Sequence, residues 1–226
     1  MTDRPRSIWL RPERTGRGPV PEHDRAGITA AAVALADAHG LGAVSMRRVA
    51  AELGTGPASL YRYVDSRDEL LELMADAAAG EVDLSRPPSG EWRADLVALA
   101  RAVRAAYRRH PWLLDLVPGR VGIGPCAVDQ LEHALAALAG LDVPGPVKLE
   151  AVAMLNGIVA LAVRTELQAG GSATAWSAAQ AEFLGAVASA GTHPHLAAAL
   201  AESPLAAEDD LLDRILPRIL AGLLEP

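Results

Sequence analysis

The stretch Met46–Val64, "MRRVAAELGTGPASLYRYV", has the spacing of two short helices joined by a tight turn. Two helices that cross at a steep angle need a small residue where their axes approach, and Ala50 is that residue. The turn needs a residue that tolerates positive φ, and Gly54 follows four residues later. Leu60, six residues beyond the glycine, anchors the second helix. This spacing predicts a helix-turn-helix.

The second helix of this unit leaves polar side chains in solvent if Leu60 and Val64 face inward. An arginine on such a surface, here Arg62, can donate two hydrogen bonds to O6 and N7 of a guanine in a major groove. Tyrosine hydroxyls can donate to phosphates, and arginines at both flanks can hold the DNA backbone. We therefore expect these residues to contact DNA: Arg47, Arg48, Pro57, Ser59, Tyr61, Arg62, Tyr63 and Arg67. The alternative is a three-helix packing unit whose charges are merely solvated.

The charge of the chain is divided between its two ends. Residues 1–67 hold ten Arg and seven Asp or Glu, a net charge of +3, whereas the remaining residues carry −10, within a total of −7. A basic front and an acidic body are typical of a polyanion-binding module attached to a part that binds no polyanion.

The rest of the chain has the pattern of helices separated by Pro and Gly. Half of the 226 residues of the whole chain are hydrophobic, and Ala and Leu prevail over β-branched residues, which favours helices. Residues 1–23 are rich in Arg, Pro and Gly without a period and predict a disordered basic arm. Helices are expected at 24–39, 46–53, 56–63, from 66 onward, 91–109, 111–117, 125–139, 146–168, 173–190 and 207–224.

Several classes of protein are excluded by composition. A single cysteine, Cys126, excludes an internal disulfide framework and a cysteine-based zinc site. The arginines near the N-terminus precede no apolar core, so they do not form a signal peptide. The longest uncharged apolar stretch, Ala151–Val163, is shorter than a bilayer crossing. We expect a soluble, cytoplasmic protein that holds no metal and no cofactor.

The segment Ser45–Leu71, "SMRRVAAELGTGPASLYRYVDSRDELL", resembles the DNA-binding segment of the TetR family of one-component transcriptional regulators. The resemblance rests on Leu60–Val64 and on Ser66–Glu69 at the start of the next helix, and it covers residues 24 to about 75. It implies that the basic arm reaches a minor groove, with Arg14 and Arg17 entering it; an idle arm is the alternative. The tip "TGPAS" offers few hydrogen bonds, so direct base readout is expected from Arg47, Ser59 and Arg62.

The segment Tyr107–Val117, "YRRHPWLLDLV", resembles the turn beside the ligand cavity of tetracycline-repressor-like C-terminal domains, a looser match that extends from about Trp92 to Phe183. This resemblance implies that a small molecule enters between the helices, reorients the fourth helix and releases a repressor from DNA. A cavity needs apolar walls and a few polar anchors. The candidate walls are Tyr107, Trp112, Met154, Trp176 and Phe183, and the candidate anchors are His110, Arg120 and Asn156. Each has an alternative as an ordinary core residue.

A single short recognition helix cannot select one genomic site, so we expect a two-fold dimer on a palindromic operator. The C-terminal helix has a wide apolar band, and the helix 146–168 is apolar on nearly all faces. Both are expected to form a self-complementary four-helix interface. The interface residues expected are Gly157, Leu212, Ile215, Leu216, Ile219, Leu220 and Leu223. The alternative is a monomer core.

The expected protein is an all-α homodimer with a disordered arm at 1–23, a helix-turn-helix DNA-binding domain at 24–67 and a ligand-binding and dimerisation bundle at 68–226. Its expected function is that of a ligand-responsive transcriptional repressor. A ligand-independent DNA-binding adaptor is one alternative. A helical enzyme with a DNA-binding head is another, but His193 and His195 lack a third ligand nearby and no nucleophile motif is present, so no catalytic residue is expected.

Overall fold

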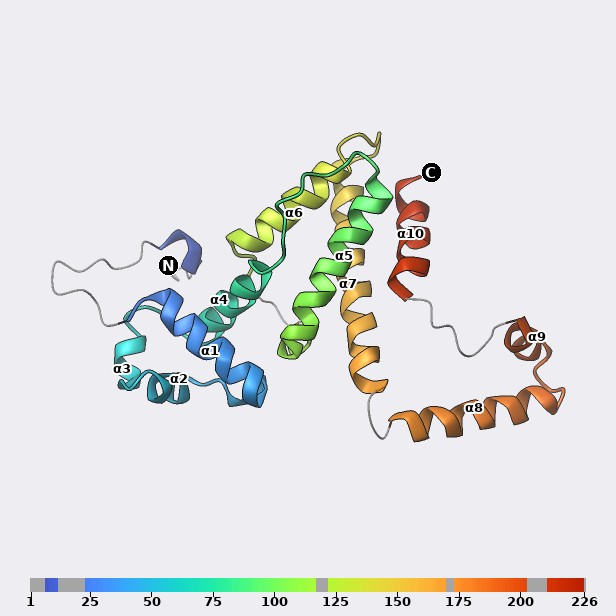
Figure 1. The fold of residues 1–226 in the computed structure, drawn as a ribbon, viewed down its shortest axis with the longest axis horizontal. Helices are drawn as coiled ribbons and strands as arrows, with labels where there is room; N and C mark the ends of the chain where they lie inside the picture. The colour runs from blue at the N-terminus through green and yellow to red at the C-terminus, as the bar shows by residue number, and fades with distance from the viewer. Residues whose placement is uncertain (1–6, 12–22, 117–121, 170–172, 203–210, 226) are drawn as a thin grey trace, which may run out of the picture.

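The computed structural model describes residues 7–11, 23–116, 122–169, 173–202 and 211–225, and within them every regular element is a helix (Figure 1). The predicted all-α fold is confirmed. The N-terminal elements are α1 (Arg25–His39), η2 (Leu41–Ala43), α2 (Met46–Glu52), α3 (Pro57–Leu60) and α4 (Arg67–Ala79). The C-terminal elements are α5 (Trp92–Arg109), η3 (Pro111–Asp115), α6 (Pro125–Ala137), α7 (Gly145–Ala169), α8 (Ala173–Ser189), α9 (Pro194–Glu202) and α10 (Leu211–Leu224).

Polar residues just before α1, α2 and α4 cap these helices. The Asp24 side chain accepts a hydrogen bond from the Gly27 amide at 2.7 Å, and Ser66 accepts one from the Glu69 amide at 3.1 Å. Gly54 has a φ of +67°, so the turn between α2 and α3 has the left-handed backbone that favours glycine. Local signals in the sequence therefore determine where these helices begin and end.

Helices α1 to α4, which we call the N-terminal unit (residues 25–79), share one apolar core. Ala50 and Leu60 are fully buried in it, as the helix-turn-helix spacing predicts. Helix α4 adds a whole face to this core, and Trp112 reaches into it from η3. The division expected at residue 67 therefore lies at the start of a helix that packs with the N-terminal unit. The α4 residues in this core are Leu70, Leu71, Leu73, Met74 and Ala78.

Helices α5, α7 and α10 lie side by side and form the C-terminal bundle, and α6 packs against α4, α5 and α7 (Figure 1). The bundle has its own apolar core, separate from that of the N-terminal unit. Helix α10 buries every fourth residue in it: Leu212, Leu216, Leu220 and Leu224.

Helices α8 and α9 project away from the bundle (Figure 1). None of the side chains described between residues 178 and 202 is buried, although this stretch is rich in Ala and Leu. Helix α9 was not predicted: the sequence analysis expected no helix between 190 and 207, whereas Pro194 stands at the first position of this helix.

Residues 7–11 are ordered, which corrects the expectation of a disordered arm for this part of it. Ile8–Leu10 form a 3₁₀ turn, here η1, and Ile8 is 1% exposed in the core of the N-terminal unit. The segment packs through its apolar residues Ile8 and Trp9, a feature that the Arg, Pro and Gly content of residues 1–23 conceals.

Helix α7 is also long and apolar enough, by length and composition alone, for a membrane crossing: among the described residues only Gly145–Gln168 qualifies, with a mean hydropathy of 1.6. The helix is longer than the uncharged stretch from which the sequence analysis argued. Its residues Leu155, Val159 and Val163 are fully buried against α5 and α10. In this fold α7 is the central helix of the bundle.

Candidate nucleic-acid interface and internal cavity

Most side chains that were predicted to contact DNA are exposed. Helices α2 and α3 form an outer edge of the N-terminal unit (Figure 1). Leu60 of α3 and Val64 just after it face inward, as predicted. Ser59 and Tyr63 are half-buried, and the exposed residues are Arg47, Arg48, Pro57, Tyr61, Arg62 and Arg67. This surface therefore offers four guanidinium groups and the exposed phenol of Tyr61.

Helix α3 ends at Leu60, three residues before the end that the sequence predicted. The Arg25 side chain of α1 donates from Nε to the Tyr63 carbonyl oxygen at 3.1 Å. This contact holds the chain after α3 in a turn, because the Tyr63 carbonyl is used by α1 rather than by a continuing helix. Sequence periodicity cannot detect a partner that lies 38 residues away.

Arg67 has a structural partner that the sequence analysis did not expect. Its guanidinium donates to the Val44 carbonyl at 2.9 Å and to the Leu41 carbonyl at 3.2 Å. Arg67 thus ties the start of α4 to the connection between α1 and α2. A phosphate contact would have to be shared with this role. Arg14 and Arg17, the predicted minor-groove side chains, lie outside the described residues.

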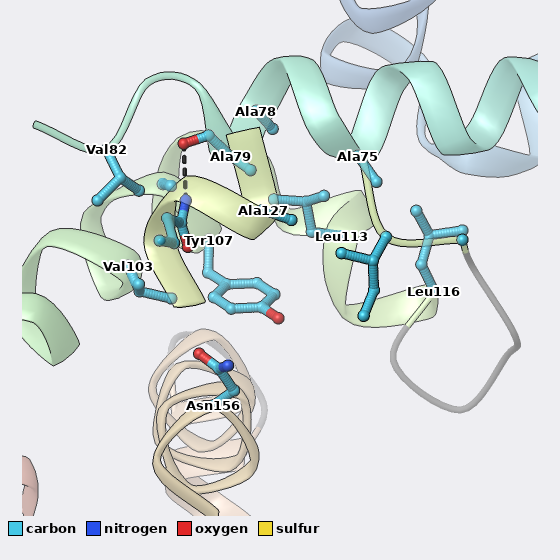
Figure 2. Close-up of a pocket in the computed structure, with 14 residues that line it drawn as sticks. Ala75, Ala78, Ala79, Val82, Val103, Tyr107, Leu113, Leu116, Ala127 and Asn156 are labelled. Atoms are coloured by element: carbon cyan, nitrogen blue, oxygen red, sulfur yellow. Dashed lines mark hydrogen bonds between the residues drawn. The ribbon is translucent and has the colours of Figure 1, made fainter. Parts of the chain in front are cut away.

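An apolar cavity of about 350 Å³ lies between α4, α5, α6 and α7 (Figure 2). Ala75, Ala78 and Ala79 of α4 form one wall, and Tyr107 and Asn156 point toward each other from α5 and α7. A second hollow of about 310 Å³ shares Val103, Ile123, Ala127, Gln130 and Asn156 with the first, so the two lie side by side. The walls of the first are mainly apolar, with the polar groups of Tyr107, Gln130 and Asn156 among them.

Among the predicted ligand residues whose side chains the structure describes, Tyr107 and Asn156 line this cavity. Met154 and Phe183 are exposed and line none of the cavity described above, which corrects their expected role as walls. Nothing is described for Arg120 or for the Trp176 side chain. The burial of Tyr107 raises the pKa of its phenol, so the hydroxyl remains a neutral hydrogen-bonding group.

His110 and Trp112 lie at the junction between the two parts of the chain rather than in the cavity. His110 is 3% exposed, with Nδ1 2.7 Å from Asp37 Oδ1 of α1 and Nε2 3.1 Å from Glu81 Oε1. Trp112 Nε1 donates to the same Asp37 oxygen at 2.6 Å. These side chains were predicted as an anchor and a wall of the ligand site; they instead join η3 to α1.

Two hydrogen bonds join the start of α6 to α4. Asp76 of α4 is buried and accepts a hydrogen bond from the Ala127 amide at 3.0 Å. Gln130 Nε2 donates to the Ala79 carbonyl at 2.7 Å, the bond drawn in Figure 2. The sequence analysis missed these residues and the alanine wall. The run Ala75–Ala79 was the available signal, since small side chains on a helix leave space beside it.

The expected dimer residues divide into two groups. Leu212, Leu216 and Leu220 are buried in the chain's own core, which corrects their assignment to an interface with a partner. The apolar band of α10 is wider than one contact face, so its centre packs inside the chain and its edge remains available. The remaining residues, Ile215, Ile219, Leu223 and Gly157, are partly or fully exposed, as are Met154 and Leu161 near Gly157 on α7.

His193 and His195, which the sequence analysis weighed as a metal pair, stand at the start of α9 and are both exposed. The Thr192 hydroxyl is 2.8 Å from His193 Nδ1. Within the part of the chain that the structure describes, no three His, Cys, Asp or Glu side chains gather as a metal site would require.

Comparison with known proteins identifies two family matches in different parts of the chain. Residues 28–74 match the family described as "Bacterial regulatory proteins, tetR family", and residues 84–226 match "Tetracyclin repressor-like, C-terminal domain". The chain is 39% identical over 227 residues to the HTH-type transcriptional repressor DrrR1 of Streptomyces coeruleorubidus, covering 96% of this chain and 83% of that protein.

The structure is similar to that of ActR from Streptomyces coelicolor. Apo ActR superposes with a TM-score of 0.75 at 28% identity, covering 91% of this chain and 97% of ActR. ActR in complex with actinorhodin gives a TM-score of 0.75 at 30% identity, with the same coverage of both chains.

Proposed function

Because the chain belongs to the TetR family of bacterial regulatory proteins, we propose that it is a repressor that a small molecule releases from a palindromic DNA operator. Family membership identifies a DNA-binding transcriptional regulator and not an enzyme. The regulator acts in the cytoplasm, where the DNA of a bacterium is accessible to it.

The DNA contacts proposed are those of α2, α3 and the start of α4. Arg62, exposed on the turn after α3, reads a guanine, and Arg47 and Ser59 assist in base readout. Arg48, Tyr61 and Tyr63 hold phosphates, Pro57 packs at the groove, and Arg67 contributes to the flank. The exposure of this set, together with the buried Leu60 beneath it, supports the assignment.

The effector proposed for the cavity is an organic molecule with an apolar body and hydrogen-bonding groups. Its apolar body would contact the alanines of α4 and Val103, while Tyr107, Gln130 and Asn156 bind its polar groups. ActR, whose fold is similar, has been crystallised in complex with actinorhodin and with (S)-DNPA. A cavity of this kind favours a ligand-responsive regulator over a ligand-independent adaptor.

Helix α4 has two roles, and these support the proposal most strongly. Leu70 and Met74 of α4 are fully buried in the core of the N-terminal unit, whereas Ala75 and Ala79 line the cavity. A molecule that enters the cavity therefore presses on a helix that shares its core with α3. A small rotation of α4 in each subunit changes the separation of two recognition helices and so releases the operator.

The dimer proposed uses the exposed apolar faces of α7 and α10. Met154, Gly157 and Leu161 are three and four residues apart, so they share one face of α7. Ile215, Ile219 and Leu223 are four residues apart and form one edge of α10. Two copies of these faces would form a self-complementary four-helix interface.

Selection from a random duplex library with the full-length chain tests the proposed function. We expect enrichment of a palindrome whose half-sites are about 10 bp apart, the spacing of one helical turn. Addition of a compound that binds the cavity should release the selected duplex. An unenriched library, or binding of selected and scrambled duplexes with equal affinity, would contradict the proposal.

A further inference from the structure

The segment Ser7–Arg11 contacts both the N-terminal unit and the start of α6. It lies 14 or more residues before α1 in the sequence, yet it packs beside the place where α4 and α6 meet. None of the DNA, effector or dimer contacts proposed above involves it.

One end of this segment is fixed to the N-terminal unit. Ile8 is buried in the core of that unit, and Arg25 donates from Nη1 to the carbonyls of Ile8 and Arg11 at 3.4 and 3.1 Å. The same Arg25 donates from Nε to the Tyr63 carbonyl at 3.1 Å, just after α3. Arg11 forms ion pairs with Asp65 and Glu69 on either side of the Ser66 cap of α4. The segment is thus tied to both boundaries of the turn between α3 and α4.

The other contact of the segment is with the start of α6. A Cβ atom placed on Gly124 would lie 2.6 Å from Cζ2 of Trp9 and 2.3 Å from Cγ of Asp76. Gly124 therefore packs with its backbone directly against both side chains, and no larger residue fits without displacing one of them. Asp76 belongs to α4, whereas Trp9 belongs to the N-terminal segment.

The same turn of α6 forms part of the cavity wall. Gly122 and Ile123 just before Gly124, and Ala127 just after it, line the cavity. A molecule in the cavity that shifts this turn must move it against Trp9 as well as against Asp76. The movement then reaches α3 by two routes, one through α4 and one through Trp9, Ile8 and Arg25.

We propose that Ser7–Arg11 is a second link between the cavity and the N-terminal unit, acting in parallel with α4, and that Trp9 is the positioning residue through which it receives the movement of α6. This inference rests on the proposed function, because it assumes that occupancy of the cavity changes DNA binding. It gives the ordered part of the N-terminal arm a role in release of the operator rather than in contact with it.

A methyl group at Gly124 imitates the push of an effector without any ligand. Gly124→Ala should weaken binding of the full-length chain to the selected duplex by about tenfold, within the usual range of allosteric coupling. In the Trp9→Ala background the same substitution should weaken binding by only about threefold, because one of the two routes is then cut. Leu10→Ala is the matched control, since Leu10 lies in the same turn and is 79% exposed; it should leave the tenfold effect intact. Equal effects of Gly124→Ala in all three backgrounds, or no effect in any, would overturn the inference.

Amide hydrogen exchange in proteins that keep Gly124 tests the inference even if Gly124→Ala does not fold. Because coupling between two sites is reciprocal, duplex binding should favour the arrangement of residues 122–130 that an effector disfavours, and so restrain the movement of this segment. We expect the duplex to slow amide hydrogen exchange there in the unsubstituted chain and in Leu10→Ala, with about half that slowing in Trp9→Ala. The same slowing in all three proteins, or none in the unsubstituted chain, would overturn the inference. Failure of the proposed function is distinguishable, since the unsubstituted chain would then not bind a selected duplex at all.

Discussion

At the residue scale, Arg62 and Arg67 show how two arginines of one motif acquire different roles. Both are exposed and both were predicted to contact DNA. Arg67, however, donates hydrogen bonds to the Val44 and Leu41 carbonyls, whereas Arg62 follows α3 at the outer edge of the N-terminal unit. The side chain that is tied to the fold should affect stability, and the side chain on the outer edge should affect recognition.

Arg62→Ala should weaken binding to the selected duplex by about 1–3 kcal/mol, because it removes a bidentate contact with a guanine. Binding to a scrambled duplex should change less. Fluorescence anisotropy on both duplexes measures the difference. Arg48→Ala is the control: as a phosphate contact, it should weaken both duplexes about equally and reduce the salt slope by about one. Equal losses on both duplexes for Arg62→Ala would show that this side chain touches only phosphates.

Arg67→Ala should lower the free energy of unfolding by roughly 1 kcal/mol, because two backbone carbonyls lose a charged donor in a partly exposed site. Arg67→Lys should restore only part of this loss, since an ammonium group does not match the spacing of two carbonyls that a guanidinium bridges. Urea denaturation of the three proteins gives the comparison. Midpoints that coincide would assign Arg67 to DNA alone.

The ionisation of Glu81 should make the stability of the fold depend on pH. Burial acts to raise the pKa of Glu81, but hydrogen bonds from Arg109 and His110 outweigh it, so the pKa lies below its ordinary value of 4.5. A carboxylate with a lowered pKa stabilises the fold above that ordinary value, and the contribution is lost as the pH falls through the lowered pKa. Glu81→Gln should therefore flatten the decline of the melting temperature below pH 4.5. Parallel declines for both proteins would contradict this assignment.

At the element scale, α10 has two apolar faces with different partners. Leu216 is 0% exposed in the chain's own core, and Leu223 is 37% exposed on the edge of the helix. The sequence analysis assigned both to the dimer interface. Burial separates them, because a continuous apolar band on a helix does not reveal which part of it packs inside the same chain.

A pair of substitutions on α10 distinguishes these faces. Leu216→Ala should destabilise each chain by about 2–5 kcal/mol, the usual cost of a large cavity in a core. Leu223→Asp should leave the helical circular dichroism intact but reduce the sedimenting mass toward that of one chain. If Leu223→Asp sediments as the unsubstituted protein does, the edge of α10 is not the interface.

Elements with local signals were predictable from the sequence, and those that depend on distant partners were not. Asp24, Ser45, Ser66 and Gly54 determine the ends of α1, α2 and α4 through bonds to residues only a few positions away, so their bounds agree with the prediction to within about two residues. The 3₁₀ turn at Ile8–Leu10 exists because Arg25 and the core of the N-terminal unit hold it. Helix α9 was overlooked because Pro194 was interpreted as part of a loop rather than as the first residue of a helix.

At the scale of the whole molecule, the cavity depends on which helices meet, and this is why its residues were hard to predict. Tyr107 and Asn156 were anticipated, but the large side chains Trp112 and His110 serve the junction, and the cavity exists where alanines of α4 leave space. Large aromatic and polar residues were expected to line the cavity. A cavity wall is often made by small ones, and only the packing of α4 against α5, α6 and α7 reveals them.

The arrangement of the two apolar cores explains how one chain can couple a ligand to DNA. The N-terminal unit and the C-terminal bundle have separate apolar cores, joined by α4, by the His110 junction and by the segment Ser7–Arg11. A bistable arrangement of such contacts lets a small shift in the cavity reorient α3 without unfolding either core.

Hydroxyl-radical footprinting of the full-length chain on its selected duplex tests whether two copies of α3 enter the grooves of one DNA duplex together. The structure predicts two protected patches, related by two-fold symmetry, on the same face of the duplex and about 34–36 Å apart. Both patches should disappear together when a cavity-binding compound is added. A single patch, or uniform protection along the duplex, would contradict the account.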